Sequence, residues 1–385
     1  MLNILIAPNS FKNSLTAEEV ADAIAQGIQN SGIKGKVLMH PIADGGDHTS
    51  FLLTKLRNGA MHTAKVKGAY LKPTQASYGL INNGKTAIIE VAETSGFKSI
   101  KQKLKSPLES STKGLGELIN TCIKSGITDF IICLGGSVTV DGGIGMLQEL
   151  GLEFFDGNKK LVRPLPKDFD KVVSMDLGKL KEQTSKCKFT VLCDVNNPLL
   201  GKEGAAHVFG PQKGASPDDI RNLEEFLQNF QSLTFDSSKK SLNKVLGGGA
   251  AGGLAAAFSV FLNADLKKGA EYFCEITDFE KSLQKADILI TGEGSMDSQS
   301  LEGKAPITVA KLAIQKKIPC IGIAGKIPLE IPDELQQYFT MLMPIGNQPE
   351  EIKEAMANTK NNIVRTIEQI SKLIHSFHNK GQNKD

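Results

Sequence analysis

Short apolar segments and amphipathic segments alternate at both ends of the chain. Apolar runs typical of buried strands lie near 3–8 and 36–42, and the segment between them, 16–30, has the spacing of an amphipathic helix. Thr16 and Glu19 have the spacing of a capping box at the start of that helix. The same order returns near the C-terminus, in a strand at 286–292, a helix from about 306, strands at 318–325 and 338–346, and a long final helix.

The middle of the chain has a different pattern. Residues 74–94 predict two short strands around the turn Asn82-Asn83-Gly84, which is typical of a hairpin. A helix near 113–125, a strand at 187–193 and an apolar helix at 251–263 follow. We therefore expect a two-domain α/β fold with its active site in the interdomain cleft. Residues 1–72 and 284–385 would form the parallel-sheet domain, and 73–283 an inserted mixed α/β domain.

Composition narrows the class of protein. The chain carries 45 basic and 42 acidic residues, so the net charge of +3 gives no footprint for nucleic acid. The N-terminus lacks the basic flank and long apolar run of a signal peptide, and the apolar stretch 253–264 is too short to cross a bilayer. The six cysteines contain no CxxC pair. We expect a cytoplasmic protein with a small-molecule substrate and no nucleic-acid or membrane partner, and leave its oligomeric state open.

The richest candidate chemistry lies at 286–306, where an apolar strand runs into glycine, carboxylates, serines and a lysine. Glycine lets the backbone approach a ligand closely, and this composition suits an anion or metal-phosphate site at the carboxyl end of a sheet. Glu293 and Asp297 are candidate metal ligands. Ser300 and Lys304 are candidate phosphate contacts. The segment points to phosphoryl chemistry.

Polar residues also follow the first two strands. Ser10 and Lys12 can contact phosphate or carboxylate oxygens, although an ordinary loop with a solvated lysine is the alternative. Asp44 is a candidate general base or metal ligand and, with Asp47, equally a candidate cap for the following helix. The glycines between these two carboxylates are candidate substrate contacts: Gly45 and Gly46.

Two further side chains are candidates in the middle segment. Asp194 ends an apolar strand, where a carboxylate can serve as general base toward a hydroxyl; capping the turn that follows is its alternative role. Lys213 lies in the segment FGPQKGA and is a candidate anion contact. The block GGSVTVDGG and the run GGGAAGG could form backbone nests for phosphate oxygens, but close helix packing explains the second almost as well. The candidates there are Gly135, Gly136, Ser137, Asp141, Gly248 and Gly249.

Three common motifs are missing from the sequence. There is no P-loop of the form GxxxxGK followed by Ser or Thr, no GxSxG nucleophile elbow, and no GxGxxG after the first strand. Their absence excludes one route to ATP binding and argues against a dinucleotide-dependent dehydrogenase.

Taken together, these segments resemble the type I glycerate kinase family nearly end to end. The motifs that carry the resemblance are APNSFKNSLTAEE, PIADGGDHT, EVAETSGF, STKGLGELI, LGGSVTVDGG, CDVNNPLLGKEGAAHVFGPQKGA, GGGAAGGLAAAF and ITGEGSMDSQSLEGKAP. The resemblance implies a two-domain α/β enzyme that uses ATP and Mg²⁺ to phosphorylate D-glycerate to 2-phosphoglycerate.

A mechanism follows as a hypothesis. Asp194 or Asp44 would accept the hydroxyl proton, Glu293 or Asp297 would hold Mg²⁺, and a lysine would offset the charge that develops in transfer. The candidate lysines are Lys12, Lys213 and Lys304.

The chain departs from the pattern of the family at several positions, among them Asn9, Val140 and Ser295. A serine at 295 cannot form the bidentate clamp of the arginine that is usual there. These departures motivate one alternative, a catalytically diverged metabolite-binding paralogue. A second alternative is a metal-dependent phosphate-ester hydrolase that uses the same carboxylates and metal.

Overall fold

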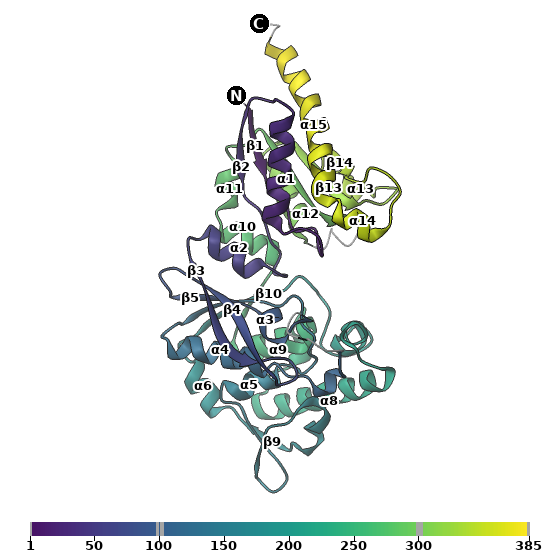
Figure 1. Ribbon diagram of the computed structural model, residues 1–385. Helices are drawn as coiled ribbons and strands as arrows, with labels where there is room; N and C mark the ends of the chain where they lie inside the picture. The colour runs from purple at the N-terminus through teal and green to yellow at the C-terminus, as the bar shows by residue number, and fades with distance from the viewer. Residues whose placement is uncertain (1, 98–99, 101–103, 298–302, 383–385) are drawn as a thin grey trace. The chain divides into compact units, whose positions relative to one another are not determined.

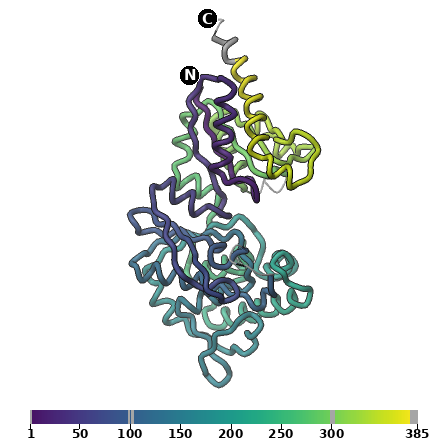
Figure 2. Tube along the Cα trace, viewed as in Figure 1, coloured from purple at the N-terminus to yellow at the C-terminus, as the bar shows by residue number. Residues whose placement is uncertain are grey.

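The computed structural model describes residues 2–97, 100, 104–297 and 303–382 of the chain (Figure 1; Figure 2). The chain forms two compact units, residues 1–44 with 269–385 and residues 45–268. Both junctions differ from the expected ones at 72/73 and 283/284. Residues 45–72 belong to the second unit because strand β3 (Ala60–Lys67) pairs along its whole length with β4 (Pro73–Ile81). Helices α10 (Gly269–Ile276) and α11 (Phe279–Leu283) belong to the first unit.

The first unit contains a five-stranded parallel sheet, as predicted from the two ends of the chain. Its strand order is β14-β13-β12-β1-β2. The strands are β1 (Leu2–Ile6), β2 (Gly35–Met39), β12 (Ile288–Ser295), β13 (Cys320–Lys326) and β14 (Met341–Pro344). Because β1 is followed by β2 on one side and borders β12 on the other, strand order reverses at β1. Loops that leave such a switch point open a crevice at the carboxyl edge of the sheet.

Helices cover this sheet. Helix α1 (Ala17–Asn30) begins with the predicted capping box: the Glu19 amide donates to Thr16 Oγ1, and Glu19 Oε2 accepts from the Thr16 amide. Figure 1 shows α1 beside the long helix α15 (Thr359–Gln382), against which it packs. The remaining helices are α12 (Ala305–Gln315), α13 (Asp333–Gln336) and α14 (Ile352–Ala357). Ile4, Ile24 and Ile367 lie in the core between sheet and helices.

The second unit is built on a six-stranded mixed sheet of order β11-β10-β6-β5-β4-β3. Strands β5 (Thr86–Glu90), β6 (Asp129–Cys133), β10 (Lys188–Leu192) and β11 (Asp265–Lys267) run parallel to one another. Strand β4 pairs antiparallel with β5, and β3 pairs antiparallel with β4. The predicted hairpin at Asn82-Asn83-Gly84 is confirmed, since it joins β4 to β5. A separate three-stranded antiparallel sheet contains β7 (Glu153–Phe155), β8 (Leu161–Val162) and β9 (Ser174–Asp176).

Aromatic packing fixes the core of the second unit. Phe130 on β6 and Phe189 on β10 stack with ring centroids 4.9 Å apart, and Phe189 also contacts Phe258 of helix α9 (Ala250–Leu262), with ring centroids 5.7 Å apart. The helices of this unit are α2 (Thr49–Leu56), α3 (Val91–Ser95), α4 (Lys113–Lys124), α5 (Ile144–Glu149), α6 (Gly178–Thr184), α7 (Ala205–Phe209), α8 (Pro217–Ser238) and α9 (Ala250–Leu262). Of the helices that the structure describes in either unit, none has the length and apolarity that a membrane span requires.

Candidate functional site

At the switch point of the first unit, the loop after β1 lies directly against β12. The Asn9 amide donates to the Gly292 carbonyl at 2.8 Å, and Thr291 Oγ1 donates to the Ala7 carbonyl at 2.6 Å. The loop therefore leaves the sheet beside the end of β12. This contact brings the predicted residues Ser10 and Lys12 to the same edge as Glu293 and Asp297.

Asn9 links the loop to a predicted carboxylate. Its Nδ2 donates to Asp44 Oδ2 at 3.0 Å, and its Oδ1 accepts the Ser10 amide at 2.8 Å. One buried asparagine thereby orients both Asp44 and the backbone at Ser10. The sequence had marked Asn9 only as a departure from the family pattern. The only sequence signal for this role was that Asn9 lies in the same motif, APNSFKNSLTAEE, as the candidates Ser10 and Lys12.

The carboxylates at the end of β12 suit a hard cation. Glu293 is 7% exposed, and Asp297 is half-buried and lies 3.4 Å from Ser295 Oγ. Mg²⁺ prefers oxygen ligands and usually takes one or two carboxylates together with water and phosphate. Within the described part of the chain, no three metal-ligating side chains gather into an all-protein cage. Glu293 and Asp297 have the ligand chemistry for such a site and stay candidate ligands.

Two predicted cations lie at this edge of the first unit. Lys12 is exposed, and Lys304 is the half-buried residue that precedes helix α12, which has proline in its first turn and no acidic residue there. Positive side chains beside the N-terminus of a helix favour an anion. Ser300, also predicted to contact phosphate, lies outside the described residues.

In the second unit, the parallel strands end at one level. Leu192 of β10 is in register with Cys133 of β6 and Lys267 of β11. Asp194 thus follows its strand at the carboxyl edge, beside Lys268. Lys268 Nζ lies 3.5 Å from the Asp194 carbonyl oxygen and 3.4 Å from Asn196 Oδ1. The sequence analysis did not select Lys268, because it did not predict the short strand β11 that precedes this lysine.

Lys213 is buried beneath the loop 134–143, which follows β6. Its Nζ donates to Ser137 Oγ at 3.0 Å and to the Thr139 carbonyl at 2.9 Å, and the residue is 3% exposed. Burial lowers the pKa of Lys213 to about 7, while the nearby Asp141 carboxylate raises it. Lys213, which was predicted to contact an anion, is therefore hydrogen-bonded to two residues of this loop and buried by the protein.

Asp141 has an internal role in the same loop. Its Oδ2 accepts from Thr112 N at 2.7 Å, Thr112 Oγ1 at 2.8 Å and Gly145 N at 3.3 Å, and its Oδ1 accepts from Gly143 N at 3.0 Å. Burial raises the pKa of this carboxyl, and the hydrogen bonds from Thr112, Gly143 and Gly145 lower it. The side chain ties the start of α4 to the start of α5 rather than facing solvent.

The two glycine-rich segments differ in how their amides are used. Gly248 N donates to the Val245 carbonyl at 2.9 Å and Gly249 N to the Asn197 carbonyl at 3.0 Å, so close packing explains this run. In contrast, Gly136 is exposed, with a φ of 72°. Gly135 N donates to the Gly45 carbonyl at 3.3 Å, which brings the turn 45–48, including Gly46, against the loop 134–143.

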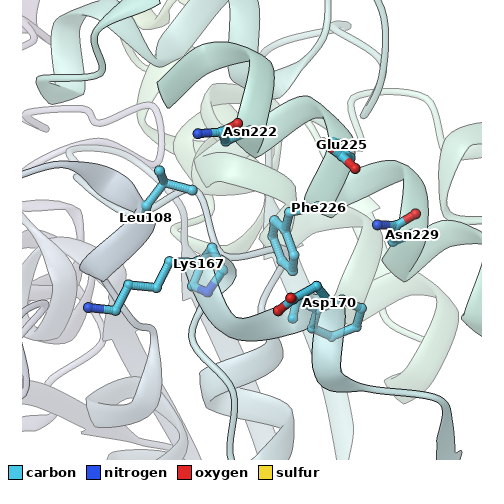
Figure 3. A pocket seen from close by; sticks show the side chains of 9 residues that line it. Leu108, Lys167, Asp170, Asn222, Glu225, Phe226 and Asn229 are labelled. Carbon is cyan, nitrogen blue, oxygen red and sulfur yellow. The ribbon is translucent and has the colours of Figure 1, made fainter. Parts of the chain in front are cut away.

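A hollow of about 200 Å³ lies elsewhere in the second unit, between the 3₁₀ turn η3 (Pro166–Lys171) and helix α8 (Figure 3). None of its lining residues was predicted as a site residue. They are Leu108, Pro166, Lys167, Phe169, Asp170, Asn222, Glu225, Phe226 and Asn229.

Comparison with known proteins gives consistent matches. The model of the glycerate kinase family matches residues 4–375. The chain is 37% identical to a glycerate kinase of Bacillus subtilis, over 97% of this chain and 98% of that one. It is also 37% identical to a glycerate 2-kinase of Escherichia coli, over 96% and 97%. A crystal structure of a proposed glycerate kinase 2 from Salmonella typhimurium superposes with a TM-score of 0.85 at 35% identity, covering 98% of this chain and 99% of that chain.

Proposed function

Because the chain belongs to the glycerate kinase family, we propose that it transfers the terminal phosphoryl group of ATP to D-glycerate, with Mg²⁺, giving 2-phosphoglycerate and ADP. One observation carries the proposal beyond the family match. The switch point between β1 and β12 gathers two carboxylates suited to Mg²⁺ and two lysines at one edge of a parallel sheet.

In this proposal, the first unit handles the phosphates. Glu293 and Asp297 would hold Mg²⁺, which when bound neutralises phosphate charge and orients the terminal phosphoryl group. Lys12 and Lys304 stabilise the negative charge on the equatorial oxygens during transfer. Such positioning and electrostatic stabilisation supply most of catalysis in phosphoryl transfer.

The acceptor step needs one general base. The glycerate hydroxyl oxygen attacks the terminal phosphorus, the bond from this phosphorus to the bridging oxygen breaks, and ADP leaves. The hydroxyl proton passes to a carboxylate, for which Asp44 and Asp194 are the candidates. Asp44 is oriented by Asn9 Nδ2 at 3.0 Å, whereas Asp194 has Lys268 beside it. The glycerate carboxylate would be received at the exposed Gly136, because the amide of the neighbouring Gly135 already donates to the Gly45 carbonyl. A contact between this carboxylate and a lysine, and the cleft between the domains, stay predictions.

A coupled ADP-release assay tests the proposal. We would compare D-glycerate, L-glycerate and related hydroxy acids, with Mg²⁺ and with excess chelator, and identify the product by ³¹P NMR. We expect Mg²⁺-dependent ADP release with D-glycerate and a 2-phosphate product. Glycerate binding without ADP release would instead indicate a metabolite-binding paralogue, and phosphate release without an acceptor would indicate a hydrolase.

Variants separate the two candidate bases. Asp44→Asn or Asp194→Asn should lower kcat by about 100-fold or more when it removes the base, because general base catalysis contributes that much. Asp236→Asn, at an exposed position on α8, is the matched control and should keep normal activity. Normal turnover by both of the first two variants would show that neither carboxylate is the base.

A further inference from the structure

Helix α2 begins without a cap of its own. Its N-cap residue, His48, has a φ of 67° and makes no side-chain cap hydrogen bond. The first amides of a helix have no partner within the helix and need acceptors from elsewhere. Glu90, the last residue of β5, supplies them: its Oε1 accepts from the Ser50 amide at 2.7 Å and its Oε2 from the His48 amide at 3.3 Å.

The carboxylate of Glu90 is buried, which is energetically unfavourable without compensating hydrogen bonds. It is only 3% exposed, and burial raises its pKa, while the hydrogen bonds from Ser50 lower it. A buried carboxylate is unfavourable unless it is hydrogen-bonded, and the N-terminus of a helix is a favourable place for a negative charge. Each of its two oxygens binds a different amide, so the carboxylate fixes both residues with respect to the sheet.

The turn 45–48, which Glu90 holds through the His48 amide, also contacts the loop 134–143. Glu90 is in register with Cys133, the residue that directly precedes this loop. On the other side, Gly135 N donates to the Gly45 carbonyl at 3.3 Å, and Thr49 Oγ1 donates to the Gly46 carbonyl at 2.7 Å. The turn 45–48 is thus held between β5 and the loop.

We propose that Glu90 is a positioning residue, which acts through the amides of His48 and Ser50 to hold the turn 45–48 where it shapes the loop 134–143 for the anionic acceptor. The inference rests on the proposed function, since that function places the glycerate carboxylate at Gly136, next to the Gly135 amide that contacts the turn. Glu90 itself does not touch substrate. It acts on the position of the turn 45–48 and, through the contact of this turn with Gly135, on the position of the exposed Gly136.

The test compares Glu90→Gln with Glu93→Gln. Glu93, on α3, is a matched control because it also accepts a backbone amide, but from Ser77 on β4, at 3.0 Å, rather than from the turn 45–48. Glutamine at 90 keeps the length of the side chain but loses its charge and replaces one acceptor oxygen with a donor group. Once circular dichroism shows both variants folded, kcat and KM are measured for glycerate and for ATP.

We expect Glu90→Gln to lower kcat/KM for glycerate by about 10- to 100-fold, because a shift of about 1 Å in the groups that position a substrate has an effect of this size. The KM for glycerate should rise, while the KM for ATP stays within about twofold, as should all constants of Glu93→Gln. A purely structural role would reduce the active fraction and hence kcat, without changing either KM. Unchanged glycerate constants in folded Glu90→Gln would overturn the proposal.

Hydrogen exchange on the wild-type chain gives a second test that needs no variant to fold. The Ser50 amide should exchange at least about tenfold more slowly than an unprotected amide, because Glu90 holds it. Exchange at the unprotected rate would show that the clamp does not persist and would overturn the inference. If wild-type protein released no ADP with any acid, the proposed function would fail, whereas this measurement would still decide whether Glu90 fixes the turn.

Discussion

Replacing Lys213 with methionine would remove an ammonium group that the fold keeps away from water. The side chain is 3% exposed, and its Nζ donates to Ser137 Oγ and to the Thr139 carbonyl. Methionine has nearly the same length and an apolar stem, so Lys213→Met changes charge and hydrogen bonding far more than volume. The variant therefore isolates the electrostatic consequence of burying this lysine.

The sign of the pH dependence follows from the direction of the pKa shift. Burial lowers the pKa of Lys213 from 10.5 to about 7, and attraction to Asp141 opposes this only partly. Between these values, the unfolded chain holds a proton on Lys213 that the folded chain has lost, so the free energy of unfolding rises with pH. One pKa unit corresponds to about 1.4 kcal/mol. The contribution should therefore grow by on the order of 4 kcal/mol from about pH 7 to the pKa of the unfolded chain.

Urea unfolding followed by far-UV circular dichroism measures this contribution, since the sequence contains no tryptophan. Wild type, Lys213→Met and Lys202→Met would be compared at several pH values above about 7. Lys202 is exposed and controls for loss of one positive charge. We expect wild type to gain stability relative to Lys213→Met as pH rises, with Lys202→Met following wild type. A constant difference between wild type and Lys213→Met across the window would refute the reasoning.

Three further predictions concern backbone conformation and buried groups. Gly252 has a φ of 71°, and an added Cβ would collide with the Thr139 carbonyl, whereas Gly126 has a φ of 84° and open space around it. Gly126→Ala should therefore lower the free energy of unfolding by roughly 1–2 kcal/mol, and Gly252→Ala by well beyond that amount. Equal losses in urea unfolding would contradict this prediction. Burial lowers the pKa of His40 to about 4, so NMR titration should find its ring neutral at pH 5, and stability should rise with pH from about 4 to 6.5; a midpoint near 6.5 would disprove it. Asp141→Asn places an amide NH₂ among backbone donors and should cost about 2–4 kcal/mol in urea unfolding, and a stability equal to wild type would speak against the role of Asp141.

The predictable parts of the fold were those with local signals. The capping box at Thr16 and the turn at Asn82-Asn83-Gly84 specify their own geometry, and apolar runs at both chain ends specify a parallel sheet. Strand β3 gave no such signal, because it is an edge strand with mostly exposed side chains and is defined by its pairing with β4. This pairing places residues 45–72 in the second unit, which the sequence pattern did not indicate.

Candidate site residues were predictable where chemistry follows directly from a strand end. Glu293 lies near the carboxyl end of β12 and Asp44 follows β2, and the carboxyl ends of these parallel strands share an edge of one sheet. The roles of Glu90 and Asn9 depend instead on partners that only the folded chain supplies, the amides of His48 and Ser50 for the first and the Asp44 carboxylate for the second. A sequence shows the carboxylate or the amide but not the tertiary contact.

The glycine-rich segments show why composition overestimates anion sites. An amide that cradles phosphate and an amide that bonds a neighbouring carbonyl are the same group, so only the partner distinguishes them. Gly248 and Gly249 donate to carbonyl oxygens of their own unit, and Asp141 is saturated by internal donors. These residues therefore bind other parts of their own unit, whereas Gly136 is exposed. Anion binding at this edge of the second unit should therefore depend on the turn 45–48 and its partner loop, and substitutions that disturb their mutual contact should matter more than changes in net charge.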